Sequence, residues 1–421
     1  MNENRPTSMI EQLSSVRMFA FPDHLGRLRV VYILKGSSSP GFDGSSISWF
    51  KPIEQSDMRL EAQHTAKRLV FADPVDPTGA PLDHQPRHVL RKVLSEAKEM
   101  GFEVRIGFEP EFFLVRKKDS GIEPVDSGGY FSLPPKSVEK LLLSVVQEAS
   151  ELGIGLLKFH HEVAPGQYEI VPEGGDPLTT CDVVVALRAL VKRAAEESGL
   201  IATFMPKPFS GLNGSGMHLH VSLVRVEDGS NAFNGGDGPT NVALSFIAGL
   251  LRRTPEITAV AAPTVNSYKR LVPGYEAPVY ISWGRSNRST LVRIPWYTRE
   301  FERIEFRVPD ASCSPHLVAA LAVAAGLEGI RDNLKPPPES AVNVYAHYSG
   351  LPSLPKDPSE AARGLLGSAF ARRVLTDGLV ERISSRLLAE WEEYREEVGD
   401  WEETRLSVSP WEVENYLGVG T

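Results

Sequence analysis

The sequence contains little cysteine. Its 421 residues include only Cys181 and Cys313, which have neither the spacing of a metal-binding pair nor the density of a disulfide scaffold. We expect both to be small, buried side chains. The sequence also has no run of about 18 apolar residues that could span a bilayer, and residues 1–5 lack the apolar core of a signal peptide. These absences favour a soluble cytoplasmic protein.

Two common nucleotide- and metal-binding signatures are missing as well. No Gly-x-x-x-x-Gly-Lys-Ser/Thr segment occurs, which excludes a P-loop enzyme. His161-Glu162 is not followed by the second histidine of a zinc-protease helix. The 54 acidic and 45 basic residues give a formal charge of −9, which argues against nonspecific binding to nucleic acid or anionic membranes. Small molecules are therefore the expected partners.

The length of the chain predicts two domains, because a single hydrophobic core rarely grows beyond about 250–300 residues. Short strand patterns occupy much of the first 72 residues, and a stretch with several prolines, 73–86, follows them. From Pro86 onward, helix and strand patterns alternate. We therefore predict an α+β protein with a small domain over residues 1–85 and a large domain over residues 86–421.

The segment Asn213–Leu223 joins a glycine-rich turn to a strand pattern. The alternation predicts three apolar residues on one strand face and three polar residues on the other, namely Met217, Leu219 and Val221 against His218, His220 and Ser222. The glycines of Asn-Gly-Ser-Gly allow a ligand to approach the backbone closely. Taken alone, the segment also fits a half-buried strand with two hydrogen-bonded histidines.

Acidic residues recur where strands would place them on a shared face. Glu109 and Glu111 are two residues apart in a strand pattern. Glu162 and Glu169 would lie directly opposite each other in a hairpin with residues 164–167 as its loop. Such like-charged pairs are costly unless they are solvated or a cation lies between them.

A third alternating pattern places Arg303, Glu305 and Arg307 on one face. Alone, it fits a solvated surface ion pair. Together with the other carboxylates and His218, it indicates an oxygen-rich site with one imidazole, which suits Mg²⁺ or Mn²⁺ better than zinc. Because guanidinium groups bind phosphate and carboxylate through two parallel hydrogen bonds, arginines beside such a metal site suggest phosphoryl transfer.

Several longer segments follow one another in a distinctive order. They are Phe42–Ile47, Glu109–Leu114, His160–Ile170, Met205–Pro208, Asn213–His218, Arg270–Pro278, Asn287–Ser289 and Arg303–Arg307. In this order, over nearly the whole chain, they resemble glutamine synthetase of the bacterial and archaeal type.

The resemblance implies a small N-terminal β-grasp-like domain and a large catalytic domain of the glutamine synthetase and guanido kinase kind, with a curved antiparallel sheet flanked by helices. It implies ATP-dependent ligation of ammonia to the γ-carboxylate of L-glutamate through γ-glutamyl phosphate. ATP would be the co-substrate, with two or three Mg²⁺ or Mn²⁺ ions per site. The expected assembly is a homo-oligomer, usually a dodecamer of two hexameric rings, with active sites between subunits.

The resemblance also assigns residue roles. The implied metal ligands form two trios, Glu111, Glu162 and Glu169 for one ion, and Glu109, His218 and Glu305 for the second. Arg288 and Arg293 would neutralise the γ-phosphoryl group during its transfer. Arg270 and Arg307 would hold the carboxylates of glutamate, and the Asn213-Gly214 turn would hold its amino group.

The remaining implied roles concern the amine and the nucleotide. Ammonium would bind near four polar residues, Asp43, Tyr130, Glu162 and Glu276. Asp43, supplied by the neighbouring subunit, would take a proton from ammonium, and Glu276 would close a loop over the intermediate. The residues assigned to the nucleotide are His220, Ser222, Arg288 and Arg303.

The chain departs from the family pattern around the expected adenine pocket. Val171–Asp176 replaces an aromatic and basic segment, and no lysine occurs around Thr298–Phe301. Two alternatives to ammonia ligation also stay open. One is a paralogue that joins glutamate to an organic amine, such as ethylamine or a polyamine. The other is a catalytically silent family member with a structural or regulatory role.

Overall fold

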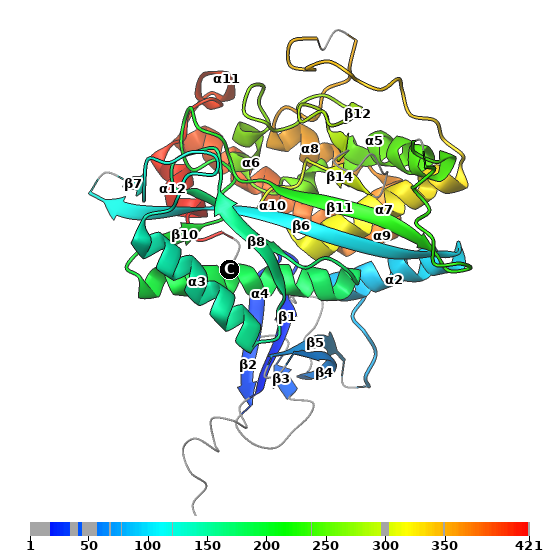
Figure 1. Ribbon diagram of the computed structural model, residues 1–421, viewed down its shortest axis with the longest axis horizontal. Coiled ribbons are helices and arrows are strands. Elements are labelled where there is room, and N and C mark those ends of the chain that lie inside the picture. Colours follow the sequence, from blue (N-terminus) through cyan, green and yellow to red (C-terminus); the bar gives the residue numbers. More distant parts are fainter. Residues whose placement is uncertain are drawn as a thin grey trace, which may run out of the picture.

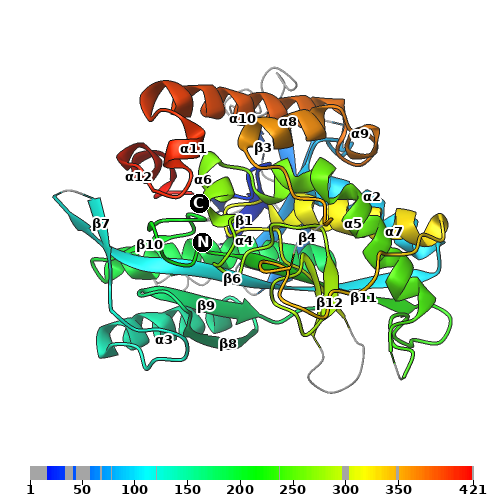
Figure 2. The ribbon, with the colours of Figure 1, turned by 90° about the horizontal axis from the view of Figure 1, so that it is seen from above.

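The computed structural model describes residues 17–33, 41–43, 57–66, 69–76, 78–119, 121–236, 238–295, 303–347 and 350–419. Its strands form a small sheet and a large sheet, and helices flank the large one (Figures 1 and 2). The predicted α+β class is confirmed. Within the described residues, no helix combines the length and apolarity needed to cross a membrane.

The small sheet comes from the N-terminal part of the chain. Its strands are β1 (Arg17–Pro22), β2 (Leu28–Ile33), β3 (Gly41–Asp43), β4 (Asp57–Ala66) and β5 (Leu69–Val75), in the order β2-β1-β5-β4-β3. β1 and β5 run parallel, and the other neighbours are antiparallel. The turn between β1 and β2 closes on the carboxylate of Asp23, which accepts the backbone N–H groups of Leu25 and Arg27.

The large sheet is built around two long neighbouring strands, β6 (Phe102–Lys118) and β11 (Met217–Arg225). Its path continues through β14 (Ile304–Phe306), β13 (Val292–Ile294) and β12 (Trp283–Arg285) on one side, and β9 (Gln167–Pro172) and β8 (Leu156–His161) on the other. β7 (Gly121–Pro124) and β10 (Ile201–Thr203) also pair with β6. All of these pairs are antiparallel except β12 with β13.

Helices cover the large sheet and extend the core. They are α2 (Pro86–Glu99), α3 (Lys136–Glu151), α4 (Pro177–Glu197), α5 (Asn241–Ala261), α6 (Val265–Arg270), α7 (Pro315–Arg331), α8 (Pro358–Leu366), α9 (Ala369–Leu375), α10 (Asp377–Glu397), α11 (Trp401–Thr404) and α12 (Pro410–Tyr416). Proline occupies the first turn of α2, α4, α7, α8 and α12, where its missing N–H costs no intrahelical bond.

Helices α5 and α7 pack unusually closely because glycine lines their contact. A Cβ added at Gly249 would lie 2.1 Å from the carbonyl oxygen of Ala325 and 2.7 Å from the nitrogen of Gly329. α5 also runs through Pro255 to Ala261. Tertiary packing thus extends a helix that its proline would weaken.

The large sheet has one apolar face and one polar face, as the strand alternation predicts. The apolar positions of its two long strands are buried in one core with α5 and α7, namely Phe102, Val104, Ile106 and Phe108 on β6 and Met217, Leu219, Val221 and Leu223 on β11. Because side chains alternate along a strand, Glu109 and His218 project from the opposite face. That face carries the candidate site.

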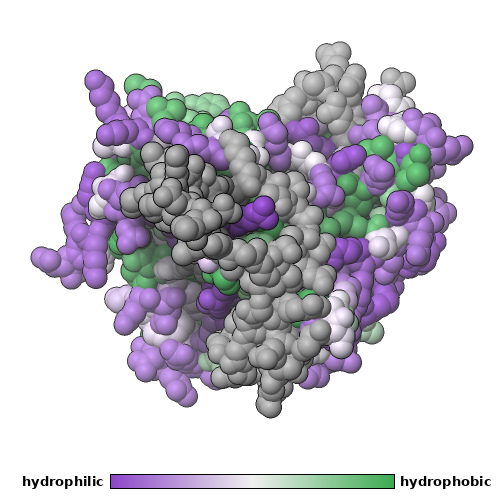
Figure 3. All heavy atoms as spheres, turned by 90° about the horizontal axis from the view of Figure 1, so that it is seen from below, coloured by the Kyte–Doolittle hydropathy of each residue, from purple (hydrophilic) through white to green (hydrophobic). Residues whose placement is uncertain are grey.

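A buried ion network ties the small sheet to the helices of the large unit. Arg87 on α2 donates to Asp73 on β5 at 2.6 Å and also pairs with Asp182 on α4. His316 on α7 contacts the same Asp182 at 3.0 Å. Figure 3 views the side on which the small sheet lies, where hydrophilic side chains predominate with apolar groups between them. The domain boundary at residue 86 coincides with the start of α2 and stays a prediction.

Candidate functional site

A strongly polar cavity lies on the polar face of the large sheet. The predicted site residues that line it are Glu109, Glu111, Tyr130, Glu162, Glu169, Asn213, Gly214, His218, Arg270, Glu276, Arg288, Arg293, Glu305 and Arg307. They come from segments nearly 200 residues apart in the sequence. Four further residues also line the cavity, Lys158, His160, Gln167 and Tyr275.

One end of the cavity holds what we call the first acid cluster, made of Glu111, His160, Glu162 and Glu169. Glu111 on β6 lies directly opposite Glu169 on β9, and His160, Glu162 and Glu169 have ligand atoms within 4.8 Å of one another. The predicted pairing of Glu162 with Glu169 is wrong. His160 lies opposite Glu169, and Glu162 donates its backbone N–H to the carbonyl of Gln167 at 2.8 Å.

Burial leaves the first acid cluster short of compensating charge. Desolvation, and then repulsion from Glu162, raise the pKa of Glu111 to about 8. Desolvation, and then repulsion from Glu109, raise the pKa of Glu169 to about 8. The nearest cation is Lys158, whose Nζ lies 3.1 Å from Oε1 of Glu169, although the lysine side chain is 53% exposed.

Glu111 is held in place by donors from two other segments. Its Oε2 accepts the side-chain amide of Gln167 at 2.9 Å and the backbone N–H of Gly216 at 2.9 Å. The amide of Gln167 also donates to the carbonyl of Gly214 at 3.1 Å. Gln167 therefore connects the first acid cluster to the glycine-rich turn.

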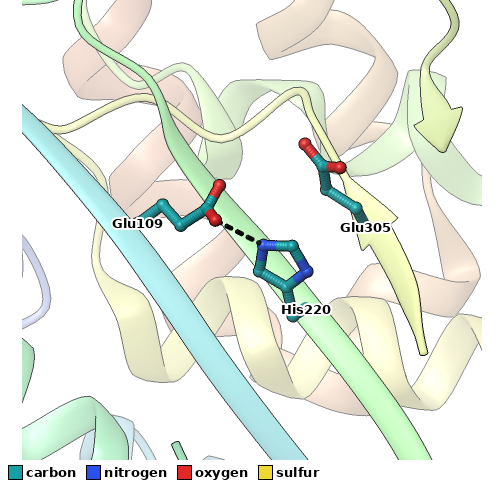
Figure 4. A group of neighbouring side chains, drawn as sticks. All are labelled: Glu109, His220 and Glu305. Atoms are coloured by element: carbon teal, nitrogen blue, oxygen red, sulfur yellow. Dashed lines mark ion pairs between the residues drawn. The ribbon is translucent and has the colours of Figure 1, made fainter. Parts of the chain in front are cut away.

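The second acid cluster consists of Glu109, His218, His220 and Glu305 (Figure 4 draws three of these four residues, all but His218). Nδ1 of His218 lies 3.5 Å from Glu109 and 3.4 Å from Glu305, and Nε2 of His220 lies 3.2 Å from Glu109. Glu109, His220 and Glu305 also have ligand atoms within 4.8 Å of one another. Both histidines thus adjoin carboxylates, whereas the sequence reasoning gave only His218 to a metal.

The protonation states of the second acid cluster differ from those of the first. Burial, and then the positive charge of Arg307, lower the pKa of His218 to about 4. Burial opposes ionisation of Glu109, but His220 and His218 hold its pKa well below the usual range. A neutral imidazole beside an ionised carboxylate is ready to bind a divalent cation.

Glu305 is enclosed by arginines. It is 1% exposed, and its Oε2 accepts from Nη1 of Arg293 at 2.6 Å, while its Oε1 pairs with Arg307. Burial opposes ionisation here too, but the positive charge of Arg307, and then His218, lower the pKa of Glu305. Glu305 therefore forms buried ion pairs with Arg293 and Arg307, and not the solvated surface ion pair that the alternating pattern alone would also fit.

The glycine-rich turn is needed because three site residues converge on it. A Cβ at Gly216 would lie 2.8 Å from Nη2 of Arg270, 3.0 Å from Nε2 of His218 and 3.2 Å from Oε1 of Glu111. A Cβ at Gly214 would lie 2.2 Å from the carbonyl of Pro206. No side chain fits at either glycine, as close approach to the backbone requires.

The cationic residues of the cavity are held by backbone carbonyls. Arg270 is 3% exposed and donates to the carbonyls of Val308 at 2.9 Å and Arg307 at 3.3 Å. Nη2 of Arg307 donates to the carbonyl of Glu276 at 2.9 Å. Glu276 itself is exposed and has a positive φ of 57°, a conformation uncommon for a residue with a side chain.

Tyr130 and Arg288 form one rim of the cavity. Their side chains are joined by a hydrogen bond. The ring of Tyr130 stacks on Phe131 with centroids 4.0 Å apart, and its edge faces His160 at 5.8 Å. Phe131 has a φ of 62° and is 66% exposed, so an exposed aromatic pair borders the first acid cluster.

The other predicted site residues lie apart from this cavity or outside the described side chains. Arg303 donates from Nε to Nδ1 of His220 at 3.3 Å, so it adjoins the second acid cluster. Ser222 lies farther along β11, opposite Arg105. Gly41–Asp43 forms β3, but the side chain of Asp43 is not described, and Thr298–Phe301 lies outside the described residues.

Lys158 and His160, which the sequence reasoning missed, have a signal that can be read from the sequence. Lys158, His160 and Glu162 are spaced two apart at the end of β8, and this spacing puts all three on the polar face. Gln167 has no such signal, because its role depends on contacts with Glu111 and Gly214 from distant segments.

The comparisons with known proteins agree with this geometry. Residues 83–406 match the family described as "Glutamine synthetase, catalytic domain". The chain is 40% identical to a glutamine synthetase of Clostridium saccharobutylicum over 402 residues, covering 89% of this chain and 88% of that one. It is 42% identical to a glutamine synthetase of Methanosarcina mazei over 380 residues, covering 84% of each chain.

Solved structures give the same result. One titled "GmaS/ADP complex" is 30% identical, with a TM-score of 0.80 over 94% of this chain and 97% of that one. A glutamine synthetase of Plasmodium falciparum, 23% identical, has a TM-score of 0.82 over 92% of this chain and 95% of that one, and it supports the fold alone. On these matches, the chain belongs to the glutamine synthetase family.

Proposed function

We propose that this protein joins ammonia to the γ-carboxylate of L-glutamate at the expense of ATP. A γ-carboxylate oxygen attacks the γ-phosphorus of ATP, ADP leaves, and γ-glutamyl phosphate forms. Ammonia then attacks the acyl carbon, phosphate leaves and glutamine remains. The observation that carries the proposal is one cavity with two acid clusters, flanked by Arg270, Arg288, Arg293 and Arg307.

The two acid clusters fit divalent cations. His160, Glu162 and Glu169 place ligand atoms within 4.8 Å of one another, and so do Glu109, His220 and Glu305. Carboxylate oxygens with imidazole suit Mg²⁺ or Mn²⁺. Glu111, Glu162 and Glu169 would hold one ion, and Glu109, His218 and Glu305 the second. When bound, such ions would neutralise phosphoryl oxygens during transfer.

Arginines would bind the remaining negative charge. Arg288 on the rim and Arg293 near Glu305 would contact the γ-phosphoryl group as it moves, because guanidinium groups stabilise the dispersed charge of its oxygens. Arg270 and Arg307 would hold the carboxylates of glutamate, and Asn213 and Gly214 would accept its amino group. All of these groups border one cavity, which supports the assignment.

The amine would enter beside Tyr130, Glu162 and Glu276, whose oxygens can accept hydrogen bonds from ammonium. Asp43 of a neighbouring subunit would take its proton, which makes assembly part of the activity. A dodecamer of two hexameric rings is the arrangement that the family resemblance suggests. Glu276 would exclude water by closing its loop over the intermediate.

The nucleotide would lie near His220, Ser222, Arg288 and Arg303. The ion-dipole contact between Arg303 and His220 at 3.3 Å supports a basic rim next to the second acid cluster. Phosphate recognition would dominate affinity here, since the segment Val171–Asp176 offers no aromatic side chain for the base. A cytoplasmic location, where ATP and glutamate are available, accompanies the proposal.

The test is amine-dependent ATP turnover by the purified protein. With ATP, glutamate and Mg²⁺ or Mn²⁺, adding ammonia should stimulate phosphate release and yield an equal amount of glutamine, measured by mass spectrometry. Glu305→Ala serves as the inactive control. If ammonia neither stimulates phosphate release nor appears in the product, the proposal is wrong.

A second candidate is ligation of glutamate to an organic amine. The exposed pair Tyr130 and Phe131 beside the amine end of the cavity favours it. Ethylamine and a polyamine, supplied in place of ammonia, separate the two activities. A silent regulatory protein would release no phosphate with any amine.

A further inference from the structure

Lys207 is a buried cation just outside the cavity lining. It is 3% exposed, and its Nζ lies 3.7 Å from the centre of the Tyr275 ring. The same Nζ donates to the carbonyl oxygen of Leu212. One ammonium group therefore contacts two segments of the site, the loop before Glu276 and the turn that leads to Asn213.

The backbone of Lys207 is fixed from behind. Its N–H donates to Oδ1 of Asn266 at 2.6 Å, and its carbonyl accepts from Nδ2 of Asn266 at 2.9 Å. The same Nδ2 donates to Glu412 of α12 at 2.7 Å, and Glu412 is fully buried. Lys207 thus projects from a rigid base, so the position of its ammonium is set by the fold.

The loop 271–277 is also hydrogen-bonded at both ends, and at its start the N–H of Leu271 donates to the carbonyl of Ser267 at 3.3 Å and that of Val272 to the carbonyl of Arg270 at 2.8 Å. Arg307 donates to the carbonyl of Glu276 at 2.9 Å, and the hydroxyl of Tyr345 donates to the carbonyl of Ala277 at 2.8 Å. None of these bonds involves the turn 212–214. Beside the side chain of Arg270, whose Cγ would lie 3.2 Å from a Cβ added at Gly214, the ammonium of Lys207 and the ring of Tyr275 connect the loop to that turn.

A charged ammonium group at the buried position of Lys207 is unfavourable by itself. Burial, and then the positive charge of Arg270, lower the pKa of Lys207 to about 8, so the lysine is still mainly protonated at pH 7. An aromatic face and a carbonyl oxygen are the groups that compensate a buried ammonium. A neutral side chain of similar length would fill the same space at lower cost.

We propose that Lys207 is a positioning residue that holds the loop 271–277 against the turn 212–214 while the acyl phosphate awaits the amine. This inference rests on the proposed function. With the loop held, water is kept from the intermediate, and each phosphate released corresponds to one amide bond. With the loop released, water attacks the acyl carbon and phosphate leaves, so glutamate is regenerated and ATP is consumed without an amide product.

Four variants of the full-length protein separate the contact from general packing. Lys207→Met and Tyr275→Leu remove the cation or the ring, whereas Lys207→Arg and Tyr275→Phe keep them. Lys192→Met is the matched control, because Lys192 is also a lysine whose Nζ lies over an aromatic ring and donates to two carbonyls, at 2.6 and 2.8 Å, away from the cavity. Two measurements are made: phosphate released per amide formed, and hydrogen exchange of residues 271–277 with ATP and glutamate present.

We expect Lys207→Met and Tyr275→Leu to raise the phosphate-to-amide ratio well above one and to speed loop exchange by about tenfold or more. Their effects should not add in the double variant. Lys207→Arg and Tyr275→Phe should stay near wild type, as should Lys192→Met. If Lys207→Met lowers only the melting temperature and leaves the ratio and the loop exchange unchanged, the inference is wrong. If the wild type releases no glutamate-dependent phosphate, the proposed function fails, and loop exchange alone decides the role of Lys207.

Discussion

Divalent metal should bind the two acid clusters with different dependence on pH. In the first acid cluster, burial and like charge raise the pKa values of Glu111 and Glu169 to about 8. In the second, the pKa values of Glu109 and Glu305 are lowered and His218 has a pKa of about 4. At neutral pH the second cluster is therefore ready to bind a cation, and the first still carries protons.

The difference in the pH dependence of metal affinity between the two clusters follows from proton release. A metal ion needs ionised carboxylates, so binding to the first acid cluster must displace protons. Glu111 and Glu169 face each other and titrate as a pair, which makes one displaced proton the minimum. One displaced proton weakens binding about tenfold for each pH unit below 8, or about a hundredfold at pH 6. Affinity at the second cluster should change little between pH 6 and 8.

Isothermal titration calorimetry with Mn²⁺ on the metal-free protein measures both sites. Titrations at pH 6, 7 and 8, each in two buffers with different ionisation enthalpies, give the affinities and the protons released. Glu111→Gln should reduce the proton release of the weaker site, with the remainder coming from Glu169. Equal affinities at all three pH values without proton release would refute the reasoning about the first acid cluster.

The same pKa values predict how stability depends on pH. The folded protein keeps protons on Glu111 and Glu169 that the unfolded chain loses above a pKa of about 4.5. These two groups therefore bind protons on folding between about pH 4.5 and 8, and their contribution to the stability of the metal-free protein should fall as the pH rises through this window, measured as the difference in melting temperature between the wild type and Glu111→Gln. Mn²⁺ at pH 8 should restore the melting temperature. A difference in melting temperature between the wild type and Glu111→Gln that stays the same from pH 6 to pH 8 would contradict the raised pKa values.

Three substitutions test other parts of the structure. Lys158→Met should tighten Mn²⁺ binding at the first acid cluster about fivefold. The effect is small because the lysine is half exposed and its attraction to Glu169 is screened. Lys158→Arg keeps the charge and should leave Mn²⁺ binding unchanged. Glu305→Ala should abolish ligase activity and lower stability by about 3 kcal/mol, since two buried arginines lose their partner, while size-exclusion chromatography should still give the wild-type oligomer. Gly249→Ala should lower stability by about 2 kcal/mol or more by forcing α5 from α7, with unchanged Mn²⁺ affinity. A wild-type melting temperature for Gly249→Ala would contradict the close helix contact.

Strand faces were predictable from the sequence because side chains alternate along a strand whatever surrounds it. The pattern around His218 gave the buried and the polar face of β11 correctly, and the spacing of Glu109 and Glu111 put both on the cavity side. Pairing between distant strands was not predictable. Nothing local to Glu111 indicates that Glu169 would lie opposite it.

The hairpin register was predicted wrongly, yet Glu162 still reached the cavity. The sequence suggested that Glu162 faces Glu169, whereas His160 occupies that place. The register is therefore displaced by two residues, which preserves the face on which each side chain lies. Gly166 permits the displacement through its φ of 68°, and a Cβ there would lie 2.8 Å from the carbonyl of Leu114. Turn geometry, which depends on such tertiary contacts, set the register.

The two acid clusters reduce the cost of burying several carboxyl groups in different ways. In the first, the carboxylates stay partly protonated because Lys158 and Arg270 offset their burial only in part, so a cation gains binding energy only after protons leave. In the second, Glu305 stays ionised because Arg293 and Arg307 already neutralise it. A carboxylate cannot give its full charge to two arginines and to a metal ion at once. Engagement of Glu305 by a cation would therefore free guanidinium groups for the anionic groups of the substrates, which is why removing this one carboxylate should cost both stability and activity.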